Sequence, residues 1–426
     1  MQRIRDTLQR LHAQHLYRTR RVLESAQGVQ VRVDGETLLS FCSNDYLGLA
    51  NDPRVVAALQ EGARCYGAGS GASHLVTGHS VVHHALEEEL AAFVGAERAL
   101  LFSSGYMANL GVVSALLGRH GAAFEDKLNH ASLIDAARLS GASVQRYPHA
   151  NLARLEKLLP AASGDKIILT DGVFSMDGDV ADVARLNILA QQHDAWLLVD
   201  DAHGIGVLGA HGRGTLELHN CIARAPLILL GTLGKAFGTF GAFIAGDADL
   251  IDYLIQHART YIYTTALPPA VAEATRASLR IVQAENWRRD VLKERIAQFR
   301  SGAAQLGLTV LDSATPIQAL VLGEAQAAVA ASEVLHAQGL LVAPIRPPTV
   351  PAGSARLRIT FSAMHTPEHV ERLLGALASL PGEHFGRNCV RPIRTLYKLR
   401  RRTDQHQLRH FVGVTARRVE RDQAAQ

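Results

Sequence analysis

Short apolar runs bounded by turn residues alternate with helical patterns through the middle of the chain. The runs at 98–103, 166–170, 196–200 and 225–230 have the continuous apolar character of strands that are buried on both faces. Strands that alternate with helices predict a mainly parallel α/β sheet. Such a sheet binds ligands beyond the carboxyl ends of its strands, so we expect the functional site there.

The pattern changes on both sides of this region. Residues 1–25 place apolar side chains at helical spacing among arginines, which predicts an amphipathic helix. Residues 29–41 alternate apolar and polar positions around Asp34-Gly35, a strong signal for a β-hairpin. We expect four segments: an N-terminal helix and hairpin (1–45), a large α/β domain (46–290), a small C-terminal α+β domain (291–382) and a basic, poorly ordered extension (383–426).

Composition is that of an ordinary globular enzyme, since the 426 residues are 47% hydrophobic and 20% charged. No apolar run approaches the ~18 residues of a membrane span, and the N-terminus lacks the apolar core of a signal peptide. The four cysteines are scattered without metal or redox spacing, so the expected location is a reducing cytoplasm. The net charge of +4 conceals a strongly basic stretch, because residues 385–426 carry 11 Lys/Arg against 3 Asp/Glu.

Lys235 directly follows one of the buried runs and lies among glycines. Glycines allow unusual backbone angles and the close approach of a bulky ligand. Desolvation at such a place favours a neutral amine, which is what a Schiff-base lysine needs. The segment alone is equally compatible with a surface lysine in a glycine-rich turn.

Asp200 and His203 follow the run 196–200 in a similar way. An aspartate that closes a buried strand can pair with the pyridinium nitrogen of pyridoxal 5'-phosphate (PLP), and the histidine can reach a neighbouring ring substituent. A metal site or a helix N-cap is the alternative, but lysine is a poor metal ligand. The three residues together favour PLP, and we expect no metal.

The segments Asp200-Asp201-Ala202-His203-Gly204 and Thr232-Leu233-Gly234-Lys235 resemble the cofactor motifs of the α-oxoamine synthases, which are PLP-dependent transferases of fold type I. Residues 43–49 also match that family closely, and the resemblance runs from about residue 16 to about residue 380. It implies a large, mainly parallel seven-stranded sheet domain with a smaller C-terminal domain. Asp171 departs from the family pattern, in which a glutamate is expected.

The resemblance assigns the cofactor contacts residue by residue. Lys235 is expected to carry PLP, Asp200 to face the ring nitrogen, His203 to bond the phenolic oxygen and His130 to stack on the ring. These four are the expected catalytic residues. The other expected PLP contacts are Gly105, Tyr106, Ser175, Thr232 and Thr265. A helix N-terminus at Gly105 is also a natural seat for a phosphate on physical grounds.

The resemblance further implies a decarboxylative Claisen condensation of an amino acid with an acyl thioester. The string 346–351 is most similar to the branch that joins L-alanine to a pimeloyl thioester, carried by CoA or acyl carrier protein, in biotin synthesis. The expected substrate contacts are Arg18, Asn44, His130, Thr349 and Arg358. Arg358 is expected to hold the alanine carboxylate, and Lys235 to abstract the α-proton as a general base.

Three other functions fit part of the pattern. A sister synthase that uses glycine or serine with another acyl-CoA would share every cofactor residue. An aminotransferase or lyase would keep the lysine but not the condensation. A non-catalytic partner subunit is disfavoured because Lys235, Asp200 and His203 are all present.

The resemblance also implies a homodimer with shared active sites, in which Thr265 reaches the neighbouring subunit's cofactor. The basic stretch 385–426 is expected to be a solvated extension, with binding to an acidic acyl carrier protein as a lesser hypothesis. Nucleic-acid binding by this stretch is less favoured than binding to a carrier protein, and no membrane contact is expected.

Overall fold

A seven-stranded sheet forms the centre of the protein, with the strand order β3-β9-β8-β7-β6-β4-β5. Its strands are β3 (Arg98–Phe102), β4 (Ala122–Asp126), β5 (Ser143–Tyr147), β6 (Lys166–Asp171), β7 (Trp196–Asp200), β8 (Leu227–Thr232) and β9 (Ala242–Gly246). Strand β9 runs antiparallel to both of its neighbours, and the other pairs are parallel. The predicted mainly parallel sheet is confirmed, and β8 begins just after Pro226, which has no N–H to pair.

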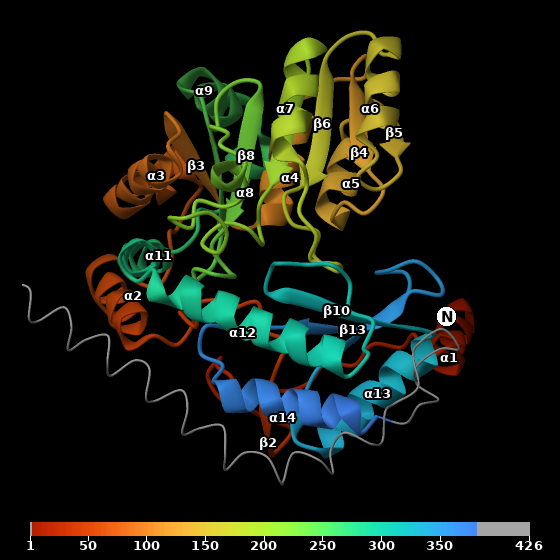
Figure 1. The fold of residues 1–426 in the computed structure, drawn as a ribbon. Coiled ribbons are helices and arrows are strands. Elements are labelled where there is room, and N and C mark those ends of the chain that lie inside the picture. Colours follow the sequence, from red (N-terminus) through yellow and green to blue (C-terminus); the bar gives the residue numbers. More distant parts are fainter. Residues whose placement is uncertain (1, 381–426) are drawn as a thin grey trace, which may run out of the picture.

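Helices cover both faces of this sheet (Figure 1). Successive residues of β8 alternate between two apolar cores: Leu227 and Leu229 belong to one, Ile228 and Leu230 to the other. This double burial explains why the strands are continuous apolar runs. The helices and helical turns of this part are α2 (Pro53–Tyr66), η1 (His74–Gly78), α3 (Val81–Val94), α4 (Gly105–Leu116), α5 (Ala131–Leu139), α6 (Leu152–Leu158), η2 (Leu159–Ala161), α7 (Val183–Gln192), α8 (Thr215–Leu218), α9 (Ala248–His257), α10 (Arg259–Ile262) and α11 (Pro269–Ala284).

Two three-stranded sheets lie in the lower part of Figure 1, with the remaining helices around them. Their strands are β1 (Gln30–Val33), β2 (Glu36–Ser40) and β11 (Leu340–Leu341) in one, and β10 (Ile317–Gly323), β12 (Ala343–Ile345) and β13 (Ala355–Thr360) in the other. The helices are α12 (Trp287–Gln305), α13 (Ala325–Ala337) and α14 (Pro367–Ala378).

The N-terminal hairpin belongs structurally to the C-terminal part of the chain. Strands β1 and β2 pair antiparallel around Asp34 and Gly35, which both have positive φ angles, so the predicted hairpin is confirmed. Strand β2 then pairs with β11, joining Leu39 to Leu340. The following segment is thereby held beside β13, since Thr360 N–H donates to the carbonyl of Phe41.

The N-terminal helix is shorter than predicted. Helix α1 (Gln2–Ala13) ends well before residue 25, and His15 has the positive φ of a left-handed residue that stops the helix. None of the α1 side chains is buried, so no packing extends the helix. The prediction of one helix over 1–25 was therefore wrong, and Arg18 lies in the extended segment that follows.

The computed structural model describes residues 2–380, so the predicted basic extension and its acidic partner fall outside the described residues. The limits of the four predicted segments stay predictions. Within residues 2–380, no helix is both long enough and apolar enough to span a membrane.

Candidate active site

Lys235 lies in the turn after β8, and its largely buried amine is 3.1 Å from His203 Nε2. Burial lowers the pKa of Lys235 to about 8, although the charges of Asp200 and Asp171 oppose the shift. The turn needs glycine at 238, because its φ is +66° and a Cβ there would come 2.3 Å from the backbone nitrogen of Ala50. The amine of Lys235 therefore lies largely out of solvent, and Lys235 is not a surface lysine in a turn.

His203 is held from its other side by Tyr46, whose hydroxyl is 2.6 Å from His203 Nδ1. Burial lowers the pKa of His203 well below its usual value, and the positive charges of Lys235 and Arg358 add to the shift. Burial also raises the pKa of Tyr46, so its hydroxyl keeps its proton. When that hydroxyl donates to Nδ1, the neutral imidazole presents its Nε2–H on the side of Lys235.

A chain of hydrogen bonds joins Asp200 to His130 through two residues of neighbouring helices. Asn109 of α4 donates to Asp200 Oδ2 and to Ser132 Oγ, each at 2.8 Å, and Ser132 Oγ lies 2.7 Å from His130 Nδ1. The other Asp200 oxygen accepts the N–H of Ala202 at 3.1 Å. All four side chains are thus fixed relative to one another at the carboxyl end of β7.

Asp171 at the end of β6 holds the same histidine by its backbone, because its Oδ2 accepts the N–H of His130 at 2.9 Å. The shorter carboxylate at this position therefore has a defined contact. Burial raises the pKa of Asp171, and the nearby charge of Asp200 raises it further. Asp201, which directly follows β7, has a structural contact: it accepts the N–H of Thr215 at 2.7 Å and is fully buried.

Arg358 on β13 approaches the site from the C-terminal part of the chain. Its Nε donates to the Ser175 carbonyl at 2.6 Å, and both terminal nitrogens lie 3.2 Å from Asn44 Oδ1. The Asn44 oxygen also lies 3.2 Å from the Tyr46 hydroxyl. Three predicted residues, Asn44, Ser175 and Arg358, are thus brought together, and the forked guanidinium of Arg358 is a group that can bind a carboxylate in a bidentate manner.

Arg18 and Thr349, predicted separately as substrate contacts, meet across 331 positions of sequence at 3.2 Å. They line a cavity of about 290 Å³ together with Arg21 and Arg346. Arg21 also lines a neighbouring cavity of about 750 Å³ that contains Lys235 and Asn44. The positive charges of three arginines, Arg18, Arg21 and Arg346, are not paired with any described carboxylate. The two cavities therefore connect Lys235 to a positively charged region formed by these arginines.

Helix α4 begins beside the Lys235 turn. A Cβ at Gly105 would come 3.0 Å from Thr232 Cγ2, so the start of the helix lies against the end of β8. The first N–H groups of a helix have no partners within it and bind phosphates well. Thr232 itself donates to the Ala202 carbonyl at 3.2 Å. The carboxyl edge of the sheet thus brings together the amine of Lys235, the buried carboxylate of Asp200 and the imidazoles of His203 and His130. With the phosphate-binding start of α4, this set of groups fits PLP.

Two predicted cofactor residues are not placed against this cluster. Tyr106 is exposed in the first turn of α4, and its hydroxyl donates to Asp135. Thr265 lies on the exposed loop after α10, and none of the hydrogen bonds among residues 2–380 joins it to Lys235, Asp200 or His203. Both assignments stay predictions.

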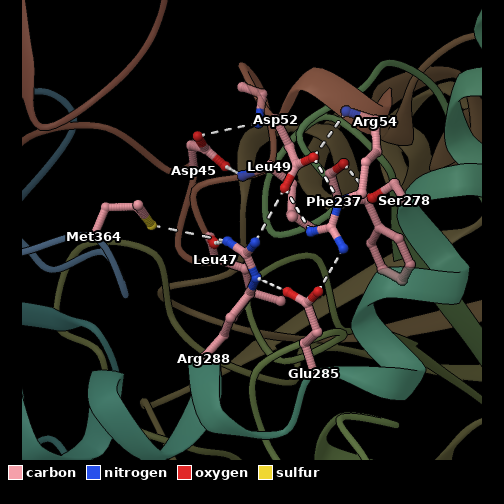
Figure 2. A network of polar contacts seen from close by, with 11 residues as sticks. Asp45, Leu47, Leu49, Asp52, Arg54, Phe237, Ser278, Glu285, Arg288 and Met364 are labelled. Carbon is pink, nitrogen blue, oxygen red and sulfur yellow. Dashed lines mark hydrogen bonds and ion pairs between the residues drawn. The ribbon is translucent and has the colours of Figure 1, made fainter. Parts of the chain in front are cut away.

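A polar network holds the segment that carries Asn44 and Tyr46 (Figure 2). Arg288 donates to the Leu47 carbonyl at 2.7 Å, to Asp52 at 3.1 Å and to Glu285 at 2.8 Å. Arg54 bridges the same two carboxylates from the exposed side. The corner between α11 and α12 therefore fixes the loop that supplies Tyr46 to His203.

Sequence reasoning missed Tyr46, Asn109, Ser132 and Arg21. Tyr46 lies inside the matched string 43–49, which is the only signal that marked it. Asn109 is a polar residue in an otherwise apolar stretch of α4, and it is fully buried. Such a residue needs a polar partner, but the sequence does not show that the partner is Asp200.

A family model described as aminotransferase class I and II matches residues 36–377. Among solved structures, a variant of serine palmitoyltransferase from S. paucimobilis with PLP and myriocin bound has a TM-score of 0.83 and 29% identity, covering 88% of this chain and 95% of that one. Fold and site together define a PLP-dependent transferase of fold type I.

More similar relatives narrow this class. The 8-amino-7-oxononanoate synthase of Nitrosococcus oceani is 60% identical over 375 residues, which is 88% of this chain and 99% of that one. The synthase of Thioalkalivibrio sulfidiphilus is 59% identical over 88% and 97% of the two chains. The structure of the Francisella tularensis synthase has 33% identity and a TM-score of 0.71, over 80% of this chain and 96% of that one. The chain belongs to the 8-amino-7-oxononanoate synthase family, and a sister synthase that uses glycine or serine is not favoured.

Proposed function

We propose that this protein condenses L-alanine with a pimeloyl thioester, releasing CO₂ and the free thiol and giving 8-amino-7-oxononanoate. The observation that carries the proposal is a pair of adjoining cavities that share Arg21: Lys235 and Asn44 line one, and Arg18 lines the other. Arg358 is hydrogen-bonded to Asn44 at the first cavity. An amino-acid carboxylate and a dicarboxylic acyl chain each have a matching group there.

Lys235, Asp200, His203, His130, Thr232 and Gly105 would hold the cofactor. PLP, when bound, supplies an electron sink that stabilises negative charge on the amino-acid α-carbon. Asn109 fixes the carboxylate of Asp200, which would keep the pyridine nitrogen of PLP protonated. His203 donates from Nε2 because Tyr46 occupies Nδ1.

Lys235 also moves the proton in our scheme. A lysine with a pKa of about 8 exchanges protons readily near neutral pH, so its amine can take the α-proton of alanine as a general base. Arg358 meanwhile holds the alanine carboxylate, and that grip orients the Cα–H bond. Asn44 releases its contact with Arg358 when the substrate carboxylate takes its place.

The far end of the acyl chain meets the cationic residues. Pimeloyl carries a second carboxylate, and Arg18, Arg21 and Arg346 have no described carboxylate of their own. Arg346 is held by the carbonyls of His15 and Tyr17 and so fixes the segment that carries Arg18. Arg21, which lines both cavities, is added here to the substrate contacts expected from sequence.

A homodimer is part of the proposal. Leu75, Val76, Phe240 and Tyr263 are exposed apolar side chains, which a partner copy would cover. The loop that carries Tyr263 and Thr265 contacts residues 67–73, called here the glycine-rich loop, since Ala266 N–H donates to the Ala72 carbonyl at 3.0 Å. Sedimentation of the wild type and of a Tyr263→Arg variant tests this face; a monomeric wild type would contradict it.

The function is tested by amine and acyl profiling of the PLP-loaded protein. L-Alanine, glycine and L-serine are supplied separately with pimeloyl-CoA and with pimeloyl-acyl carrier protein, and products are identified by mass. We expect product with alanine, and the two carriers show which thioester is preferred. Product only with glycine or serine would keep the chemistry and overturn the substrate.

A further inference from the structure

A cluster of histidines lies between the glycine-rich loop and helix α3, and the proposed reaction does not use it. His79, His84 and Glu87 each offer one ligand atom, and these atoms all lie within 4.8 Å of one another. His79 precedes the N-cap of α3, while His84 and Glu87 lie one turn apart on the helix. His83 is not part of the group, because Ser80 and the Leu267 carbonyl occupy both of its nitrogens.

Glu87 is the anchored member of the cluster. Its Oε1 accepts the N–H of Leu101 on β3 at 2.9 Å, which fixes the carboxylate plane. Its Oε2 is 3.9 Å from His79 Nε2, too far for a hydrogen bond. One carboxylate oxygen and one imidazole nitrogen thus face each other across a gap that neither closes.

The second ring nitrogen of His79 has a hydrogen-bond partner, as in most metal-binding histidines, although here the partner is another histidine. Its Nδ1 lies 3.0 Å from Nδ1 of His74, which is itself stacked on the ring of Tyr261 at 4.9 Å between centroids. With the shared proton on His79 Nδ1, its Nε2 keeps a free lone pair on the side of Glu87. Two of the three candidate ligands, His79 and Glu87, are thus held in place by hydrogen bonds to other residues.

The distances suit a small adjustment to a tetrahedral ion. Zinc binds nitrogen and carboxylate oxygen at about 2.0–2.2 Å, which places neighbouring ligand atoms about 3.4 Å apart. The gap between His79 and Glu87 must close by only about half an ångström on that geometry. His84 is exposed and its Nε2 lies 3.5 Å from Glu88 Oε1; such exposed pairs are weak, so binding the ion requires only that His84 exchange this contact for the metal.

We propose that His79, His84 and Glu87 form a binding site for a divalent transition metal of the zinc class, with water as the fourth ligand. Two imidazoles and a carboxylate suit zinc or cobalt, and the absence of thiolate disfavours softer ions. The bound ion would brace the turn His74–Gly78 against α3. Since Ala72 binds the loop at Ala266, the brace extends to the glycine-rich loop.

Cobalt(II) titration of the PLP-loaded protein tests the site directly. Tetrahedral cobalt has visible absorption of its own, read as a difference spectrum against the metal-free holoenzyme, and zinc should displace it. We expect one equivalent per chain, and a rise in melting temperature with zinc because the ion binds the folded state. His84→Gln and Glu87→Gln should each weaken binding at least tenfold, and His74→Gln by about 10- to 100-fold through the lost support.

His257→Gln is the matched control, because His257 is another histidine near a helix end, bonded to the Tyr253 carbonyl. It should bind cobalt as the wild type does. His84 is exposed, so His84→Gln tests the site without endangering the fold. The proposal is overturned if cobalt fails to bind stoichiometrically, or if it binds equally well to the wild type and to both the His84→Gln and Glu87→Gln variants.

Discussion

Replacing Arg358 by lysine should damage alanine binding and leave thioester binding intact. Arg358 is almost fully buried and directs three N–H groups at Ser175 and Asn44. Lysine keeps the charge but loses the planar fork, so a carboxylate held by two charge-assisted hydrogen bonds keeps only one. A hydrogen bond to a charged group is worth about 2 kcal/mol, which corresponds to a roughly 30-fold rise in the KM for alanine.

The assay is steady-state kinetics with each substrate varied in turn. Arg356→Lys is the matched control, because Arg356 lies two residues away on β13, is similarly buried, and pairs with Asp177 instead of contacting Asn44. It should lower stability without changing the ratio of the two KM values. An equal rise in both KM values for Arg358→Lys, or no change in either, would refute the role given to Arg358.

Three further predictions rest on single contacts or pKa shifts. Uptake of PLP by the apo-protein should accelerate with pH around a midpoint near 8, because burial lowers the pKa of Lys235; a stopped-flow midpoint near 10.5 would contradict this. Tyr46→Phe should lower kcat about tenfold by leaving His203 Nδ1 without its donor, at a cost of about 1–3 kcal/mol; an unchanged kcat would remove Tyr46 from the mechanism. Burial lowers the pKa of His149, but hydrogen bonds to Asp126 and Asp179 outweigh it and raise the pKa to about 10. This stabilisation is complete below pH 6.5 and is lost as pH rises toward 10, so His149→Asn should cost about 2 kcal/mol at pH 6 and less at pH 10 in urea unfolding.

Local signals predicted the elements that the site needs. The apolar runs before Asp200 and Lys235 became β7 and β8, because continuous apolar runs of this short length, bounded by turn residues, are typical of strands buried on both faces. The helix start at Gly105 followed from its position after a strand. The N-terminal helix shows the limit of such local signals. Leucines at helical spacing among arginines predicted a helix over 1–25, but α1 ends at Ala13 because no other element packs against it.

Contacts between distant segments could not be predicted in the same way. Tyr46 meets His203 across 157 positions, and Arg358 meets Asn44 across 314. Those distances depend on β2 pairing with β11 and on the corner held by Arg288, which no local pattern encodes. The family resemblance supplied Arg358 and Asn44. The role of Tyr46, which contacts both Asn44 and His203, emerged only from the structure.

The most direct test of the condensation follows the alanine carboxylate. PLP-loaded protein is incubated with pimeloyl-CoA and L-alanine labelled at its carboxyl carbon, with Lys235→Ala as the control. We expect labelled CO₂ and unlabelled 8-amino-7-oxononanoate in equal amounts from the wild type, and neither from the variant. Label retained in the product, or product formed equally well without Lys235, would contradict the account.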